Sequence, residues 1–414
     1  MKLENILIYN TEKRRFLHGC LSFENGIITE IEYDGKTGDG CRRVIPGLVD
    51  VHTHGRAGVD IMTADEDELT ALSRSYSSLG VTTVFPTVMT AEKDEIINAL
   101  KRIKSASEKA FCHFAGVHIE GPYISEKRPG CHTVSLIRRP DADEIKALSD
   151  IVSPLKTHVT LAPEAGEYDT VKKCSEYGIT VGIGHSDALY DECMKALENG
   201  ACTFTHTFNA MRPLLHREPG CVGAALSSDA FAEFIADGFH LAPSVVNLSY
   251  KAKGNDRFVL ITDSIAAAGM PDGKYALAGI PVNVKDGKIL TEDGTIAGSS
   301  LDMNTGVKNL MKFTGKPLEE ILPCATENPA KQVGIYDVCG SLDAGKRADI
   351  LILGYTSPKC ASLLTENKLT QTLLSADYAK ELADAAREAS LSPLAVHVAI
   401  DTGMGRIGYP ARTE

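Results

Sequence analysis

Short apolar runs alternate with amphipathic segments through most of the chain. Segments such as 65–80, and the one that starts at Ala91, have apolar residues at helical spacing, which predicts helices between strands. Strands that alternate with helices are typical of parallel β-α-β units and of the α/β class. The apolar runs that predict strands begin at Val44, Val81, Phe114, Val159, Ile179, Ala201, Ala232 and Arg257. Eight such strands predict a closed (β/α)8, TIM-like barrel.

The two flanks of this region have a different pattern. Residues 1–43 and the stretch from Tyr275 to about Leu353 contain alternating runs and glycine-rich turns, which are typical of small β domains. We therefore expect one β-sandwich made from both ends of the barrel segment. The predicted division is 1–46 for the first sandwich part, 47–274 for the barrel, 275–300 for a sandwich insertion, 301–335 for the end of the barrel and 336–353 for the second sandwich part.

Nearly every predicted barrel strand ends in a side chain that can do chemistry. These residues are His52, His54, Glu120, Glu164, His185, His206, His240 and Asp263. In such barrels the active site lies at the C-terminal ends of the strands. One histidine at a strand end is more often structural than functional, but so many at one mouth are hard to explain by packing alone.

The histidines and one carboxylate predict a metal site. His52 and His54 lie two apart on a strand, so both side chains project from the same face. Alone, such a pair is a weak indication of a metal ligand. Imidazole nitrogen and carboxylate oxygen suit zinc, with iron or manganese also possible. Together with Glu120, His185 and His206, the pair predicts a site for a divalent metal.

Asp263 follows the apolar run FVLIT and has two interpretations. An aspartate after a strand can cap the next helix. It can equally act as a general base for a water that a metal has activated.

Charge and composition limit the kinds of molecule that the protein can bind and the compartment in which it works. The formal net charge of −12 argues against nucleic acid or an anionic membrane, since both need a basic surface. The 11 cysteines include no C-x-x-C pair, which argues against a disulfide framework. No apolar run has the length of a signal peptide or a membrane span. We expect a cytoplasmic protein.

Eight motifs, in their order along the chain, resemble those of a known protein family. They are PGLVDVHTHG, GVHIEGPYI, GIGHSDA, THTFNAM, REPG, ADGFH, TDS and AGSSLDM. Residues 1 to about 353 resemble the N-acetylglucosamine-6-phosphate deacetylases of the amidohydrolase superfamily. The resemblance implies removal of the acetyl group from N-acetylglucosamine 6-phosphate, giving glucosamine 6-phosphate and acetate.

The resemblance also implies roles for individual residues. Glu120, His185 and His206 match the conserved metal ligands, and His52 and His54 match members that can hold a second ion. Asp263 matches the catalytic aspartate, and His132 matches the histidine that polarises the acetyl carbonyl. Substrate contacts are implied for Cys131, Asn209, Ala210, His240, Ile296, Ala297, Gly298 and Ser299.

Arg217, in the HREPG segment, would by itself be taken for an ordinary surface arginine. It resembles the arginine that family members donate across a homodimer interface to the phosphate of the substrate. A guanidinium suits a phosphate because it donates hydrogen bonds in a bidentate fork.

The last segment, 354–414, resembles an internal piece of an alanine racemase, most clearly in HVAIDTGMGRIG. It lacks the racemase segments that carry the cofactor lysine and the catalytic tyrosine, so no racemisation is expected. The segment has the pattern of a strand–helix–strand unit. The sandwich before it lacks its closing strand, so we expect an unpaired sheet edge there. Limited proteolysis is therefore expected to cut first between Gly354 and the helix at Ala376, and protease resistance equal to that of the barrel would contradict this expectation.

Two other functions compete with deacetylation. One is hydrolysis of a cyclic amide by a relative of dihydroorotases and hydantoinases, which use a carboxylated lysine where this chain has Glu120. The other is binding of a sugar phosphate without turnover, against which the intact Asp263 argues.

Overall fold

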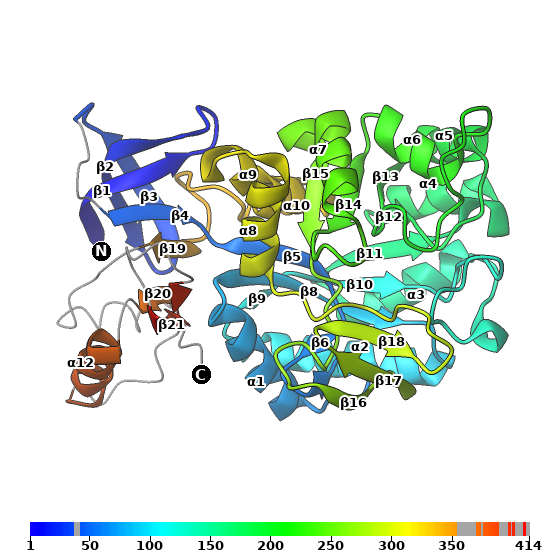
Figure 1. The fold of residues 1–414 in the computed structure, drawn as a ribbon, viewed down its shortest axis with the longest axis horizontal. Coiled ribbons are helices and arrows are strands. Elements are labelled where there is room, and N and C mark those ends of the chain that lie inside the picture. Colours follow the sequence, from blue (N-terminus) through cyan, green and yellow to red (C-terminus); the bar gives the residue numbers. More distant parts are fainter. Residues whose placement is uncertain are drawn as a thin grey trace.

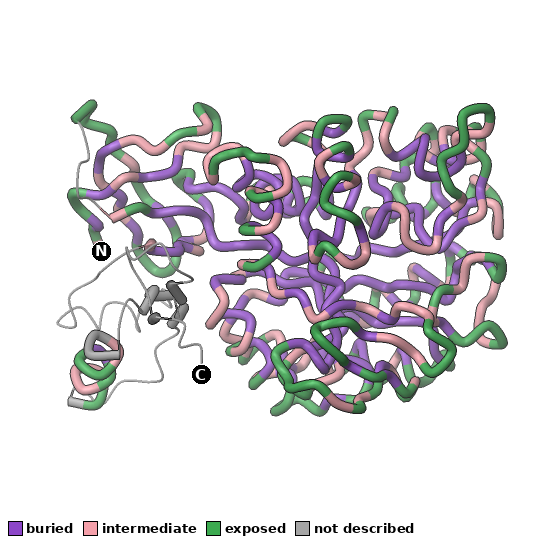
Figure 2. Tube along the Cα trace, viewed as in Figure 1, coloured by how far each residue is buried: buried purple, intermediate pink, exposed green. Residues whose placement is uncertain are grey.

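The computed structural model describes residues 1–36, 42–353, 370–373, 376–388, 396–398, 400–401 and 409–410. Figure 1 shows a barrel with helices around it and, at one side, a separate β layer that contains the N-terminus. The centre of the barrel is the most continuously buried part of the molecule (Figure 2).

The predicted barrel is confirmed. Its strands pair in parallel with their sequence neighbours, in the order β5-β8-β10-β11-β12-β13-β14-β15. The strands are β5 (Leu48–Thr53), β8 (Val81–Met89), β10 (Gly116–Glu120), β11 (Lys156–Leu161), β12 (Thr180–Ile183), β13 (Ala201–Phe204), β14 (Phe231–Ile235) and β15 (Phe258–Ile261). A short strand, β9 (His113–Phe114), pairs with β8.

The barrel closes between its last and first strands. The amide of Asp263 donates to the carbonyl of His52 at 2.9 Å, and the amide of His54 donates to the carbonyl of Ser264 at 2.7 Å. Closure leaves no strand edge in the barrel. It also brings the residue after β15 next to the two histidines of β5.

Helices cover the outside of the barrel (Figure 1). They are α1 (Glu66–Ser77), α2 (Lys93–Ser107), α3 (Ala142–Val152), α4 (Tyr168–Glu176), α5 (Tyr190–Glu198), α6 (Gly220–Ser227), α7 (Pro243–Arg257), α8 (Met303–Thr314), α9 (Leu318–Ala325) and α10 (Glu327–Gln332), with short 3-10 turns η1 (Val134–Leu136) and η2 (Pro163–Ala165). The start of α1 follows from its sequence. Asp65 accepts the amide of Glu68, and Glu68 accepts the amide of Asp65, which forms a capping box.

The flanking β layer uses both ends of the barrel segment, as predicted, and forms one mixed sheet. Its strands are β1 (Lys2–Asn10), β2 (Arg15–Glu24), β3 (Ile27–Tyr33), β4 (Arg42–Pro46) and β19 (Ile350–Leu353). β4 lies between β1, with which it is parallel, and β19, with which it is antiparallel. The layer contacts the barrel through α9, where the hydroxyl of Tyr9 donates to the carbonyl of Glu319.

The segment around 275–300 differs from the prediction. We expected it to join the flanking sheet, but β16 (Gly273–Leu277), β17 (Ile280–Lys285) and β18 (Lys288–Thr291) form a separate three-stranded sheet. The apolar side chains of this sheet, among them Leu277 and Val282, pack in the same core as the barrel. Nearby, β6 (Gly55–Arg56) and β7 (Val59–Asp60) form a two-stranded ribbon. The alternating pattern predicted the strands correctly, but it carries no information on which sheet they join.

The described part of the last segment contains the predicted helix and strand. They are α12 (Ala376–Glu388) and β21 (Val396–Val398), preceded by β20 (Thr370–Leu373) and followed by the short pair β22 (Ile400–Asp401) and β23 (Tyr409–Pro410). The expectation of an unpaired edge is wrong, because β20 pairs in parallel with β19, and β21 with β20. Leu382 of α12 packs in the core of the flanking sheet. Most of the predicted cleavage region, 354–375, lies outside the described residues.

Across the described ranges, no helix has both the length and the apolar character that a membrane crossing requires.

Candidate active site

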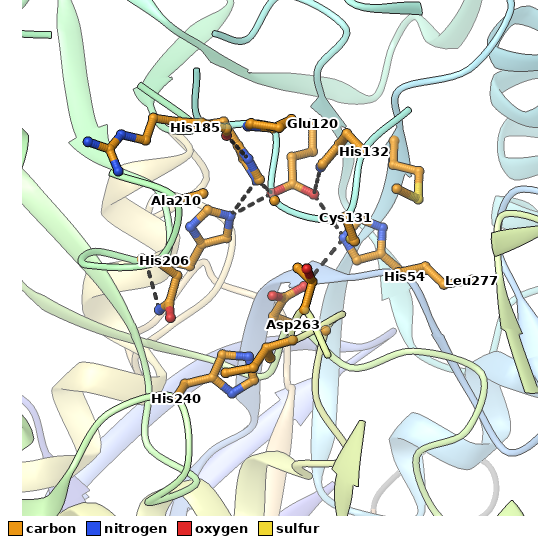
Figure 3. A pocket seen from close by; sticks show the side chains of 18 of the residues that line it. His54, Glu120, Cys131, His132, His185, His206, Ala210, His240, Asp263 and Leu277 are labelled. Carbon is orange, nitrogen blue, oxygen red and sulfur yellow. Dashed lines mark hydrogen bonds and ion pairs between the residues drawn. The ribbon is translucent and has the colours of Figure 1, made fainter. Parts of the chain in front are cut away.

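The candidate site lies at the C-terminal ends of the barrel strands, where parallel strands direct their last side chains to one place. His185, His206 and Asp263 each follow a strand and have positive φ angles of 46°, 28° and 49°. Residues with side chains rarely adopt this conformation, and it concentrates at functional sites. The backbone therefore turns sharply as each strand ends and directs these side chains toward one another (Figure 3).

Glu120, at the end of β10, lies at the centre of the cluster and is buried. Its Oε1 lies 3.3 Å from Nε2 of His185 and 2.8 Å from Nε2 of His206. Its Oε2 lies 3.5 Å from Nε2 of His52 and 3.0 Å from Nε2 of His54. Each oxygen of one carboxylate thus faces a separate pair of imidazoles.

These five residues, His52, His54, Glu120, His185 and His206, form the donor cluster. They give two sets of donors that suit a divalent metal, His52–His54–Glu120 and Glu120–His185–His206. In each set the ligand atoms lie within 4.8 Å of one another. The Nε2 atoms of the histidines converge on acidic oxygens. Nitrogen and oxygen donors in a buried cluster match the preference of zinc and similar ions, so the residues present fit a metal.

Asp263 faces the first of these sets. Its Oδ1 lies 3.4 Å from Nε2 of His52 and 3.4 Å from Nε2 of His54. Burial opposes ionisation of Asp263, but the two neighbouring imidazoles hold its pKa below the ordinary value. No helix begins directly after Asp263, so the helix-cap interpretation does not hold.

The negative charge of the cluster also acts on His54. Burial would lower the pKa of this ring, but the carboxylates of Asp263 and Glu120 raise the pKa to about 9. The site therefore attracts positive charge. A metal ion that binds there must displace the proton, because only the neutral ring can be a ligand.

His132 lies beside the cluster, with Nε2 3.7 Å from Oε2 of Glu120. Burial lowers the pKa of His132 to about 3, so the ring is neutral at physiological pH. Its Nδ1 lies 2.7 Å from the hydroxyl oxygen of Thr90. When the hydroxyl of Thr90 donates this hydrogen bond, the ring proton is on Nε2, where it can be donated to a substrate.

A cavity of about 410 Å³ opens over these groups. Figure 3 shows His54, Glu120, His132, His185, His206 and Asp263 around it. Of the predicted substrate contacts, the structure places Cys131, Asn209, Ala210, His240, Ile296 and Gly298 in the cavity wall. Ala297 and Ser299, from the same turn, do not line it; Ala297 is buried, and Ser299 donates its hydroxyl to the carbonyl of Thr262.

Two of the predicted residues lie elsewhere. Arg217 is exposed on the loop between β13 and α6, outside the lining of this cavity within the single chain. Glu164, which also ends a strand region, accepts hydrogen bonds from the hydroxyl of Ser186 and the amide of Asp187. Its carboxylate supports the loop that follows His185 and does not face the donor cluster.

Sequence reasoning missed several residues of the site. Lys127, Arg128, Leu277 and Thr295 line the cavity. The carbonyl of Arg128 lies 2.9 Å from Nδ1 of His185 and can accept its proton, which leaves Nε2 of that ring free to face the cluster. The only sequence signal for Lys127 and Arg128 was their place between the GVHIEGP motif and His132.

The fold and the donor cluster define a metal-dependent hydrolase. The amidohydrolase family model matches residues 43–400. N-acetylglucosamine-6-phosphate deacetylase of Vibrio furnissii is 38% identical over 79% of this chain and 84% of that protein. N-acetylgalactosamine-6-phosphate deacetylase of Escherichia coli O157:H7 is 35% identical over 80% of this chain and 90% of that protein.

Solved structures of such deacetylases are also similar to this chain over most of its length. That of N-acetylglucosamine-6-phosphate deacetylase from Thermotoga maritima has a TM-score of 0.78 and 35% identity, and the match covers 85% of this chain and 95% of that chain. A mutant of the Mycobacterium smegmatis enzyme, in complex with N-acetyl-D-glucosamine-6-phosphate, also has a TM-score of 0.78, with 30% identity over 86% of this chain and 95% of that chain. This chain belongs to the amidohydrolase family, in the branch of the N-acetylglucosamine-6-phosphate deacetylases.

Proposed function

We propose that this protein hydrolyses the N-acetyl group of N-acetylglucosamine 6-phosphate to give glucosamine 6-phosphate and acetate. The observation that carries the proposal is the cluster of two donor sets joined by Glu120, with Asp263 and His132 beside it at the mouth of the barrel. The likeness to the deacetylases over about four fifths of the chain supports this substrate. We place one or two divalent ions in these sets, with zinc as the first choice.

In this proposal each side chain has a separate task. A divalent ion held by Glu120, His185 and His206 would supply Lewis acidity, which lowers the pKa of a water and polarises the acetyl carbonyl. Asp263 takes the proton of the attacking water and returns it to the nitrogen of the leaving amine. His132 donates from Nε2 to the acetyl oxygen as negative charge develops there. Thr90 holds His132 in the tautomer that can do so.

We propose that the sugar phosphate is held by Cys131, Asn209, Ala210, His240 and the 296–299 turn. The chemistry of the wall suits this, because it offers amide and imidazole donors next to the apolar side chain of Leu277. His240 is oriented by Asp237, whose Oδ2 lies 2.7 Å from its Nδ1.

The direct test is acetate release from N-acetylglucosamine 6-phosphate by metal-loaded protein. N-acetylgalactosamine 6-phosphate in parallel defines the sugar preference, since one similar protein is a deacetylase of that sugar. A cyclic ureide tests the hydantoinase alternative. Hydrolysis of the ureide alone, or binding of the sugar phosphate without turnover, would contradict the proposal.

We also propose that two chains form a homodimer and that Arg217 reaches the phosphate in the active site of the partner subunit. Within one chain Arg217 lies outside the cavity lining, on a loop where Leu214 and Leu215 are 50% and 55% exposed. In the proposed dimer these two leucines would be covered by the partner subunit, which removes their apolar surface from water.

If Arg217 binds the phosphate, Arg217→Ala should lower kcat/KM for N-acetylglucosamine 6-phosphate by about 10- to 100-fold, because charge-assisted hydrogen bonds are lost. Unphosphorylated N-acetylglucosamine should be affected far less. Steady-state kinetics on both sugars measure the difference, and Arg139→Ala removes another exposed arginine as the matched control. Equal losses on the two sugars would exclude the phosphate role.

A further inference from the structure

Glu233 is a carboxylate inside the barrel that the proposed mechanism does not use. It lies in the middle of β14 and is completely buried. Burying a carboxylate is unfavourable unless hydrogen bonds or opposite charge compensate for it. An acidic residue in an otherwise apolar strand, of which all residues but Phe231 are buried, therefore needs a specific explanation.

One oxygen of the Glu233 carboxylate faces the donor cluster, and the other faces Gln332 and His158. Its Oε2 lies 3.5 Å from Nδ1 of His52 and 3.3 Å from the backbone nitrogen of His206, which donates to it. Its Oε1 accepts a hydrogen bond from Nε2 of Gln332 and lies 3.9 Å from Nε2 of His158. One oxygen thus contacts a residue from each of the two donor sets.

The contact with His52 fixes the tautomer of that ring. An ionised carboxylate only accepts hydrogen bonds, so His52 must carry its proton on Nδ1. The lone pair is then on Nε2, which faces His54 and Glu120 at 3.3 and 3.5 Å. With the opposite tautomer, Nε2 would carry a proton and could not bind a metal.

Among the four histidines of the two sets, His52 is the one whose second ring nitrogen faces a carboxylate in the described part of the chain. Nδ1 of His185 faces a backbone carbonyl. Nδ1 of His54 and Nδ1 of His206 have no hydrogen-bond partner there. A carboxylate behind a ligand imidazole raises its basicity and holds its orientation.

We propose that Glu233 is a positioning residue that sets His52 as an Nε2 ligand and so determines how tightly the His52–His54–Glu120 set binds an ion. This inference rests on the proposed metal-dependent function and deepens it. In the described part of the chain, the second set, Glu120–His185–His206, contacts the Glu233 carboxylate through one backbone amide, that of His206. The two sets should therefore respond differently to a change at Glu233.

The test compares metal binding by wild-type protein, Glu233→Gln and the control Glu327→Gln. Glu327 is also a buried carboxylate, but its partners are Arg14 and Lys331 instead of a ligand ring or its loop. Each protein is titrated with Co²⁺, whose absorption reports the ligands of each ion, and competition with a chelator gives the two affinities. Elemental analysis gives the ions per chain, and circular dichroism confirms the fold.

In Glu233→Gln the amide either donates to His52, which moves the ring proton to Nε2, or accepts from it more weakly than a carboxylate does. Both arrangements weaken the first set. We expect the affinity of that set to fall by about 10- to 100-fold, while the ion at Glu120–His185–His206 is retained. Glu327→Gln should bind both ions as the wild type does.

Wild-type affinity for both ions in Glu233→Gln would overturn the inference. Loss of both ions from a folded Glu233→Gln protein would overturn it too, because Glu233 would then support the whole mouth and not His52. If the wild type binds one ion, at the second set alone, the inference is wrong although deacetylation can still hold. Acetate release by the wild type decides that separate question.

Discussion

Asp263→Asn is expected to abolish turnover and to leave the metal in place. Asparagine has nearly the same shape as aspartate but cannot accept the proton of the attacking water. Loss of a general base typically lowers the rate by about a hundred- to ten-thousand-fold. Neither donor set includes Asp263, so both keep their full complement of ligands in the variant. The measurement is kcat for acetate release, together with elemental analysis of the same protein.

A control separates catalysis from a general effect of losing an aspartate. Asp141 accepts the amides of Asp143 and Glu144 at the start of α3. Asp141→Asn should leave turnover unchanged, because asparagine is also a good cap. Near-normal activity in metal-replete Asp263→Asn would remove Asp263 from the mechanism.

Glu120→Gln is expected to empty the metal site and to remove activity with it. Glu120 contributes to both donor sets, so its charge is lost from each. The loss of affinity should exceed the about 10- to 100-fold that follows loss of an outer partner of a ligand. Metal content by elemental analysis, after dialysis against a metal-free buffer, measures the effect.

The histidines provide the comparison. His185→Ala or His206→Ala should also empty the Glu120–His185–His206 set, whereas His52→Ala or His54→Ala should affect only an ion in the His52–His54–Glu120 set. This difference follows from the division of the donors into two sets that share only Glu120. Full occupancy in Glu120→Gln would refute the ligand assignment.

The sequence predicted the barrel and the gathering of the donor residues for the same physical reason. Parallel strands must end at the same mouth, so a side chain at each strand end lies near the others whatever the connecting helices do. The short distances between Glu120 and the rings of His185 and His54 are consistent with this. Glu164 shows the limit of the rule, because its carboxylate accepts a hydrogen bond from Ser186 in the next loop.

The rest of the site depends on information that a linear pattern does not carry. The left-handed backbone at His206 and Asp263 has no sequence signature, since neither residue is a glycine. Which pair of imidazoles each Glu120 oxygen faces depends on the rotation of the Glu120 side chain. Glu233 was noticeable only as an acid within an apolar run, and its partner His52 is 181 residues away.

The strand order of the flanking sheet has a consequence for how the protein is made. β4 pairs with β19, and Ile350 lies opposite Pro46, so the sheet joins strands from opposite ends of the barrel segment. During synthesis from the N-terminus, β1 to β4 leave the ribosome long before β19 exists, and one edge of β4 has no partner until then. Such an edge attracts strands of other chains. The whole barrel is synthesised in this interval, so nascent chains are most exposed to association before the final strands emerge, and slower translation of the barrel region should lengthen that period.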